Sequence, residues 1–138
     1  MIRQLFPLSL DVLQQSLDLR QQRQGVLSSN IANVETPGFI AKELHFEEAL
    51  RAAAHPAEQG PLRRTDPRHF PPQIPSIHDV QGHLTTRLSH DVGRDLNTVS
   101  IDREMAALTT NTLHYNASAN ILGRLFSGLR WIINEGRP

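Results

Sequence analysis

The residue types best suited to chemistry in this chain are its seven histidines. Four of them lie near aspartates in the middle of the chain, namely His69, His78, His83 and His90. Zinc needs three or four ligands converging within about 2.0–2.3 Å. None of these four histidines is spaced as H-x-H or H-x-x-x-H from another, so the sequence itself brings no two ligands together. We therefore predict solvated loop histidines and no metal site, with a small histidine-dependent metal-binding enzyme as the distant alternative.

Patterns typical of enzymes are missing as well. No G-x-S-x-G motif frames a nucleophilic serine, and no P-loop or G-x-G-x-x-G motif is present to bind phosphate. Glu47 and Glu48 are adjacent, so they do not face each other as an acid–base pair on a helix or a strand. The absence of cysteine excludes a thiol nucleophile. We predict no catalytic residues and no cofactor, and we expect the protein not to be an enzyme.

Charge and hydropathy exclude two further classes of protein. Fourteen basic and fourteen acidic side chains cancel, whereas a nucleic-acid-binding protein normally carries a basic excess. No apolar run reaches the roughly 18 residues that cross a bilayer, so we expect no membrane insertion. The first residues lack a sustained apolar stretch, and we expect no cleavable secretory signal.

Proline divides the chain into helical ends and an irregular middle. Residues 8–34 and 99–135 contain no proline, whereas residues 51–98 contain most of them. Because proline fixes φ and removes a backbone donor, the middle cannot be one continuous helix. The pattern predicts a helix over 8–34, a turn and a short segment over 35–50, a flexible Pro/His-rich middle over 51–98, and a helix over 99–135.

The C-terminal helix carries the clearer periodicity. Apolar residues recur at alternating spacings of four and three, which is typical of a helix that packs along one seam. The predicted seam consists of Ile101, Met105, Leu108, Thr112, Tyr115, Ala119, Leu122, Phe126, Leu129 and Ile133, with Thr112 as its polar member.

The N-terminal helix shows the same spacing with a polar gap. Leu10, Leu13 and Leu17 form the first part of the seam, and Leu27 and Ile31 resume it. The gap is occupied by Arg20 and Gln24, beside Gly25. Thr36, Pro37 and Gly38 then predict a turn, and a short helix or strand-like segment is expected between Leu44 and Ala54.

Together these patterns predict a single, mostly α unit spanning residues 1–138. Its long N- and C-terminal helices are expected to pack as a coiled-coil-like pair, with an irregular or partly β middle segment. Because one apolar seam per helix must be covered by a partner, assembly into a larger structure is expected.

One string of residues is far more specific than a helix stop followed by a turn. Residues 28–39 read SSNIANVETPGF, and this string resembles the S-x-N-I-A-N-x-x-T-P-G-[FY] signature of the flagellar basal-body rod proteins. The matching residues are Ser28, Asn30, Ile31, Ala32, Asn33, Thr36, Pro37, Gly38 and Phe39. The resemblance covers roughly residues 10–50 and 98–133, and its C-terminal part is most similar to proximal rod subunits.

The resemblance implies a structural subunit of the proximal rod of the bacterial flagellum. Such a subunit would be exported by the flagellar type III apparatus without signal cleavage, and Phe6 and Leu10 are a possible export element. It would polymerise through its terminal helices in a helical array and transmit torque. Its partners would be other rod proteins and the junction of the export apparatus with the MS ring. It would be located in the rod, which crosses the periplasmic space. A sister proximal rod protein or another axial component is the alternative.

Overall fold

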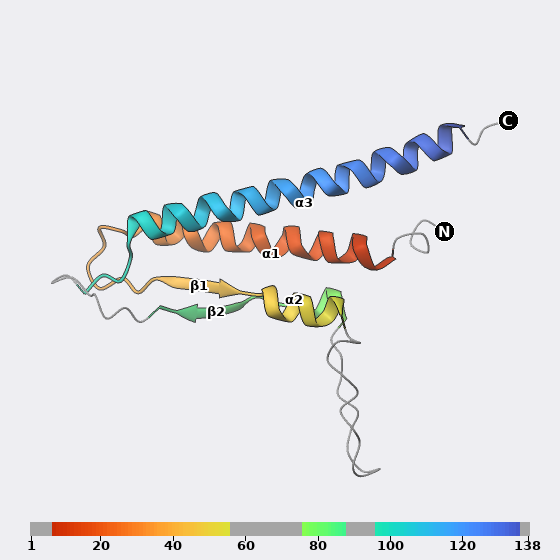
Figure 1. The fold of residues 1–138 in the computed structure, drawn as a ribbon. Coiled ribbons are helices and arrows are strands. Elements are labelled where there is room, and N and C mark those ends of the chain that lie inside the picture. The colour runs from red at the N-terminus through yellow and green to blue at the C-terminus, as the bar shows by residue number, and fades with distance from the viewer. Residues whose placement is uncertain (1–6, 56–75, 88–95, 136–138) are drawn as a thin grey trace, which may run out of the picture.

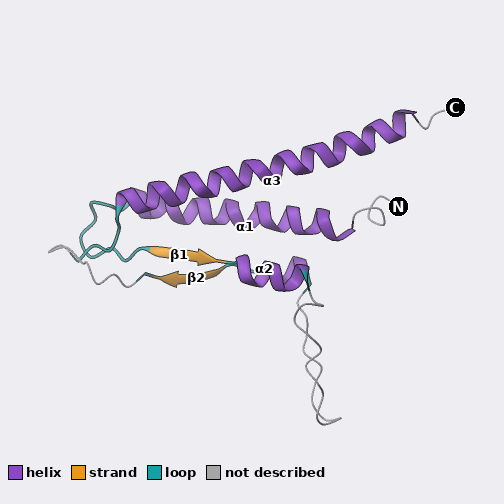
Figure 2. Cartoon of the chain, viewed as in Figure 1, coloured by secondary structure: helices purple, strands orange, loops and turns teal. Residues whose placement is uncertain are grey.

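The computed structural model describes residues 7–55, 76–87 and 96–135. These residues form α1 (Pro7–Ala32), β1 (Lys42–His45), α2 (Glu47–Ala54), the 3-10 turn η3 (Ile77–Asp79), β2 (His83–Thr86) and α3 (Ile101–Glu135). Figure 1 shows α1 and α3 lying side by side and running in opposite directions, with the sheet and α2 on the other side of α1. The predicted fold is confirmed: it is mostly helical, its two long helices pack together, and its middle is partly β (Figure 2).

The two long helices differ in length and in the charges at their ends. α1 has 26 residues and α3 has 35, or about 39 Å and about 52 Å at roughly 1.5 Å per residue. Asp102 and Glu104 lie in the first turn of α3, where the helix dipole favours negative charge. Figure 1 shows α3 tilting away from α1 and extending past the start of α1. None of the described helices is long and apolar enough to cross a membrane.

The sheet consists of two short antiparallel strands that are far apart in sequence. Lys42 lies opposite Thr86, and Leu44 lies opposite Leu84. Just beyond the strands, the Arg87 N–H donates to the Ala41 carbonyl at 2.7 Å. The pairing joins residues 42–45, which follow the turn after α1, to residues 83–86 of the segment predicted to be irregular.

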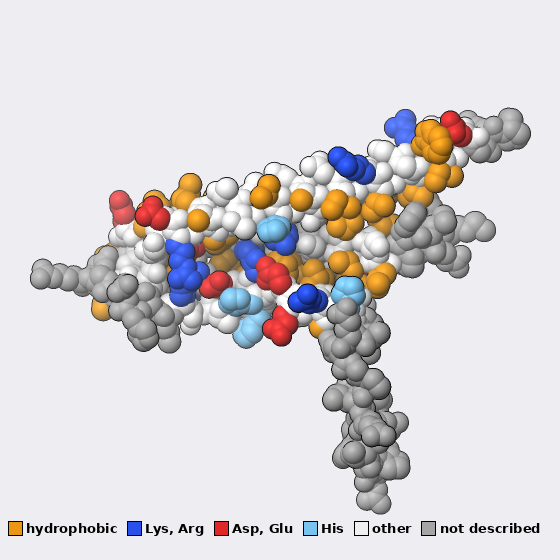
Figure 3. All heavy atoms as spheres, in the orientation of Figure 1, with side chains coloured by type: hydrophobic (Ala, Val, Ile, Leu, Met, Phe, Trp, Pro, Cys, Tyr) orange, Lys and Arg blue, Asp and Glu red, His pale blue; other side chains and the backbone are white. Residues whose placement is uncertain are grey.

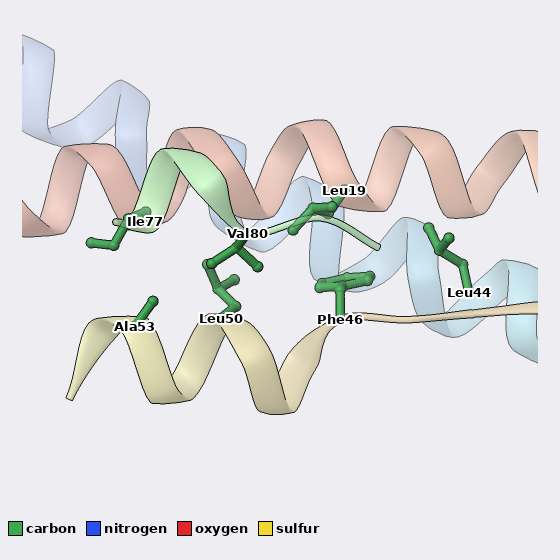
Figure 4. Packing of buried hydrophobic residues seen from close by; sticks show 7 residues of the cluster. All are labelled: Leu19, Leu44, Phe46, Leu50, Ala53, Ile77 and Val80. Carbon is green, nitrogen blue, oxygen red and sulfur yellow. The ribbon is translucent and has the colours of Figure 1, made fainter. Parts of the chain in front are cut away.

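The main apolar core lies between α1 and the group formed by β1, α2 and η3, not between the two long helices. Its buried residues are Leu19, Leu44, Phe46, Leu50, Ala53, Ile77 and Val80 (Figure 4). Gln15 of α1 donates to the Val80 carbonyl at 2.6 Å, which fixes η3 against the helix. Leu19, only 1% exposed, is the α1 residue at the centre of this cluster. The seam spacing did not include Leu19, because that residue belongs to a second face of α1.

Candidate functional site

The signature string forms the end of α1 and the turn that follows. The Asn33 side chain donates to the Ser29 carbonyl at 2.8 Å, and the Thr36 N–H donates to the Asn33 carbonyl at 3.0 Å. Gly38 has φ +73°, a left-handed conformation that glycine adopts without the steric cost of a Cβ. The Asn, Thr and Gly residues of the signature therefore each have a local role in stopping the helix and reversing the chain.

A buried asparagine just before α3 holds this turn in place. The Asn97 side-chain amide contacts the carbonyls of Asn33, Val34 and Thr36 at 3.0, 2.7 and 2.9 Å. Next to it, the Thr98 N–H donates to the Phe39 carbonyl at 3.1 Å. The turn is thus attached to the residues that lead into α3, which fixes how the two long helices approach each other. Asn97 belongs neither to the signature nor to a predicted seam, so no pattern in the sequence pointed to it.

Asn30 of the signature connects α1 to both β1 and α3. It is only 1% exposed. Its amide nitrogen donates to the Lys42 carbonyl at 2.8 Å and to the Glu104 carboxylate at 2.9 Å, and its oxygen accepts from the Lys42 N–H at 3.0 Å. Buried polar groups need hydrogen-bond partners. The amide of asparagine suits this position because its nitrogen donates and its oxygen accepts.

Glu104 completes what we call the buried polar network, formed by Asn30, Glu43, Arg87 and Glu104. Glu104 is fully buried, and it accepts from Arg87 at 2.6 Å. Arg87 also donates to Glu43 at 3.0 Å. Burial alone would lower the pKa of Arg87, but its two carboxylate partners outweigh this effect and raise the pKa. Since an unpaired buried charge is costly, the network favours one arrangement of α1, the sheet and α3.

A second polar contact crosses the helix pair at the predicted gap in the N-terminal seam. The buried Asn111 donates to the Arg20 carbonyl at 2.9 Å and to the Gln24 side chain at 3.1 Å. In coiled coils, a polar residue at such a position fixes the register at some cost in stability. Glu104 and Asn111 are seven residues apart, so both lie on the face of α3 that contacts α1.

Arg23 attaches the other side of α1 to the start of α2. It donates to the Leu44 carbonyl at 3.0 Å and pairs with the Glu47 carboxylate, and its guanidinium lies 4.4 Å from the centroid of the Phe46 ring. Partial burial would raise the pKa of Glu47, but the hydrogen bonds and charge of Arg23 hold it lower, at about 2. Glu47 therefore stays ionised in mild acid and keeps this attachment.

The predicted seam residues differ widely in burial. On α1, Leu27 is buried, while Leu10, Leu13, Leu17 and Ile31 are half-buried. On α3, Leu108, Leu122 and Leu129 are half-buried, whereas Met105, Tyr115, Phe126 and Ile133 are exposed. The residues of α3 that are fully buried are instead Glu104 and Asn111.

Two physical reasons account for the exposed seam residues. Near the start of α3, the contact face is centred on Glu104 and Asn111, so Met105 lies to one side of it. Near the end, Phe126 and Ile133 follow Leu122 by four and eleven residues, which places them on nearly the same face. They are exposed because α3 there tilts away from α1 and extends past it (Figure 1).

Further apolar side chains are exposed along this last part of α3 (Figure 3). Their spacing places them on more than one face of the helix. We call the exposed set the apolar end of α3; it comprises Ile121, Phe126, Trp131, Ile132 and Ile133, each 51–62% exposed. A helix that is apolar on several sides is normally buried. Exposed apolar surface of this extent marks an interaction site.

The described residues offer no arrangement for catalysis. No group of three His, Cys, Asp or Glu residues among them could hold a metal ion. His78 lies 3.6 Å from Asp11, and His83 is on β2, whereas His69 and His90 are outside the described residues. The cleft of about 540 Å³ between α1, the sheet and α3 is lined by Arg23 and Arg87 among others, and both arginines are already paired with carboxylates.

These features define a structural subunit: two long helices fixed at one end by a signature turn, with an exposed apolar surface at the other end. Comparison with known proteins agrees with this class. The model of the family described as flagella basal body rod protein matches residues 10–39.

Curated relatives extend the similarity over most of the chain. The flagellar basal body rod protein FlgB of Yersinia enterocolitica is 35% identical, over 89% of this chain and 91% of the relative. The FlgB proteins of Aeromonas hydrophila and Escherichia coli K12 are 37% and 32% identical, with 90% and 89% of this chain and 91% of each relative covered. The chain belongs to the FlgB family of flagellar basal body rod proteins. It is a structural component of the rod and not an enzyme, as predicted.

Proposed function

We propose that the chain is a subunit of the proximal rod that polymerises through its two terminal helices. The observation that carries this proposal is the apolar end of α3. Its residues are exposed in the single chain, and two of them, Phe126 and Ile133, belong to the seam whose spacing is typical of a packed helix. In a rod, the helices of neighbouring subunits would cover them, and the close packing would transmit torque.

The proposed partners are other rod proteins, further copies of this chain in a helical array, and the junction between the export apparatus and the MS ring. The family supports assembly with other rod components, because the relatives are named as basal body rod proteins. We also propose that the chain reaches the rod, across the periplasmic space, through the flagellar type III apparatus without signal cleavage. Leu10 of the possible export element is half-buried on α1, and Phe6 lies outside the described residues.

The assembly proposal is tested by replacing one exposed residue of the apolar end. We expect Phe126→Asp to prevent rod formation, because a charge in a helix–helix interface is costly. The free subunit should keep its fold, since Phe126 is 54% exposed. Rod formation is measured by electron microscopy of basal bodies isolated from cells that carry the variant and lack the natural chain. The fold of the free subunit is measured by circular dichroism of the purified variant.

Asn116→Asp is the matched control, because it adds the same charge at an exposed residue of α3 that lies outside the apolar end. Cells with this variant should build rods and swim. Uncleaved chain of both variants should be found outside the cytoplasm if export precedes assembly. Normal basal bodies in cells carrying Phe126→Asp would overturn the assembly proposal, and retention of all chains in the cytoplasm would overturn the export proposal.

A further inference from the structure

The two outer edges of the sheet differ in how their backbone groups are satisfied. The edge of β1 that faces α1 is covered by side chains: Asn30 pairs with the N–H and C=O of Lys42, and Arg23 donates to the Leu44 carbonyl. β2 lies on the side of β1 away from α1 (Figure 2). The sheet can therefore be extended only at β2.

The register identifies the backbone groups that β2 turns outward. Arg87 donates its N–H to Ala41, so residues 87 and 85 point toward β1. By the alternation of the antiparallel ladder, the N–H and C=O groups of Leu84 and Thr86 point away from β1. No hydrogen bond within the described part of the chain uses these four groups.

Within the described residues, the outer edge of β2 also lacks the usual protection against pairing. Natural edge strands are commonly protected by proline, lysine or a bulge, and β2 has the sequence HLTT. Leu84 is 49% exposed although it lies directly opposite the buried Leu44. The apolar face of the sheet therefore continues to an uncovered side chain at this edge.

We propose that the outer edge of β2 pairs two free copies of this chain. The edge is self-complementary in an antiparallel register centred on Thr85, because Leu84 of each copy then exchanges both hydrogen bonds with Thr86 of the other. Thr85 lies beside Thr85 of the second copy, a favourable cross-strand pair. His83 lies beside Arg87 of the second copy, whose charge is already paired with Glu43 and Glu104. The result is a four-stranded sheet.

The pair is weak and belongs to the free subunit. Four hydrogen bonds and two partly covered leucines bury far less than the roughly 1,200 Å² of a stable interface. A two-fold axis also points the two copies in opposite directions, whereas subunits of a rod share one direction. The inference rests on the sheet alone and does not depend on the proposed role in the rod.

Disulfide trapping tests the pairing, because the chain contains no cysteine. Thr85→Cys places two thiols directly opposite each other, about 4.5–5.5 Å apart between Cβ atoms. Thr86→Cys is the matched control, since two copies of that residue are diagonal neighbours too far apart for an unstrained bridge. We expect the purified Thr85→Cys chain to form disulfide dimers at least about tenfold faster under mild oxidation.

If dimers formed by random collision, Thr86→Cys would form them faster than Thr85→Cys, because Thr86 is the more exposed of the two residues. Equal rates, or faster dimerisation of Thr86→Cys, would overturn the inference. Adding Leu84→Lys to the Thr85→Cys chain should slow dimerisation, since charged residues protect sheet edges. An unchanged rate would also count against the pairing. Cells carrying Leu84→Lys alone should still build rods, because the pairing belongs to the free subunit and the proposed rod assembles through the terminal helices.

Discussion

At the scale of single residues, the most demanding feature is a carboxylate with no access to water. Glu104 is 0% exposed and depends on Arg87 and Asn30 for its hydrogen bonds. Attraction within a buried pair often does no more than offset the loss of hydration. The network therefore adds specificity more than stability, because any other register of the helices would leave Glu104 unpaired.

Arg87→Met removes the charge that compensates Glu104. We expect the free energy of unfolding to fall by about 3–5 kcal/mol, the usual cost of leaving a buried charge unpaired. Urea unfolding followed by circular dichroism measures the change. Adding Glu104→Gln should recover most of the loss, because glutamine can still accept from Asn30 and carries no charge. If the double variant is no more stable than the single one, the buried charge is not the cause.

At the scale of elements, the turn that follows α1 requires a conformation that only a few residues adopt easily. Gly38, with φ +73°, and Gly25, in the middle of α1, are both free of neighbouring atoms at the position of a Cβ. A substitution at either site thus changes conformational preference and adds no clash. The two glycines form a matched pair for testing why the signature contains glycine.

Gly38→Ala should destabilise the fold by about 1 kcal/mol, because a Cβ disfavours positive φ. Gly25→Ala should stabilise it by about 1 kcal/mol, because alanine is the better residue in a helix interior. Thermal unfolding of the two variants beside the unmodified chain measures both effects. Changes of the same sign would show that the turn does not depend on the conformation of Gly38.

Periodicity was sufficient to predict the long elements. The helices predicted over 8–34 and 99–135 correspond to α1 at Pro7–Ala32 and α3 at Ile101–Glu135. The segment expected between Leu44 and Ala54 contains both alternatives, since the end of β1 is followed directly by α2. The pairing of β1 with β2 was not predicted, because it joins strands separated by a Pro-rich segment and has no local signal.

The contact face of α3 was harder to predict for a related reason. Apolar residues occur on more than one stripe of this helix, and spacing alone cannot tell which stripe meets α1. Glu104 and Asn111 lie at the centre of the contact, yet their polarity excludes them from any search for apolar seams. Their partners are 74 and 91 residues away in the chain, so only the folded structure brings these groups together.

At the scale of the whole molecule, the main apolar cluster does not lie where the two longest helices meet. The apolar cluster joins α1 to α2, η3 and β1, whereas the contact of α1 with α3 contains buried polar residues and half-buried leucines. We therefore expect the packing of β1, α2 and η3 on α1, and not the helix pair, to contribute most to the stability of the free chain.

Two leucine substitutions compare the two regions directly. Leu19→Ala, in the apolar cluster, should lower the free energy of unfolding by about 2–5 kcal/mol, the range for a fully buried leucine. Leu122→Ala, on the half-buried face of α3, should cost about half of that or less. Urea unfolding of both variants gives the comparison. A larger loss for Leu122→Ala would place the main stabilising contact between the long helices instead.

The attachment of the signature turn to Asn97 has a mechanical consequence. The helix pair is fixed at that end by hydrogen bonds to three carbonyls, while Figure 1 shows the helices separating toward the other end. We therefore expect the opening angle of α1 and α3 to change more easily than the geometry at the turn. A neighbour inserted between the open ends could change this angle without disturbing the turn, so one sequence could fit sites of different curvature.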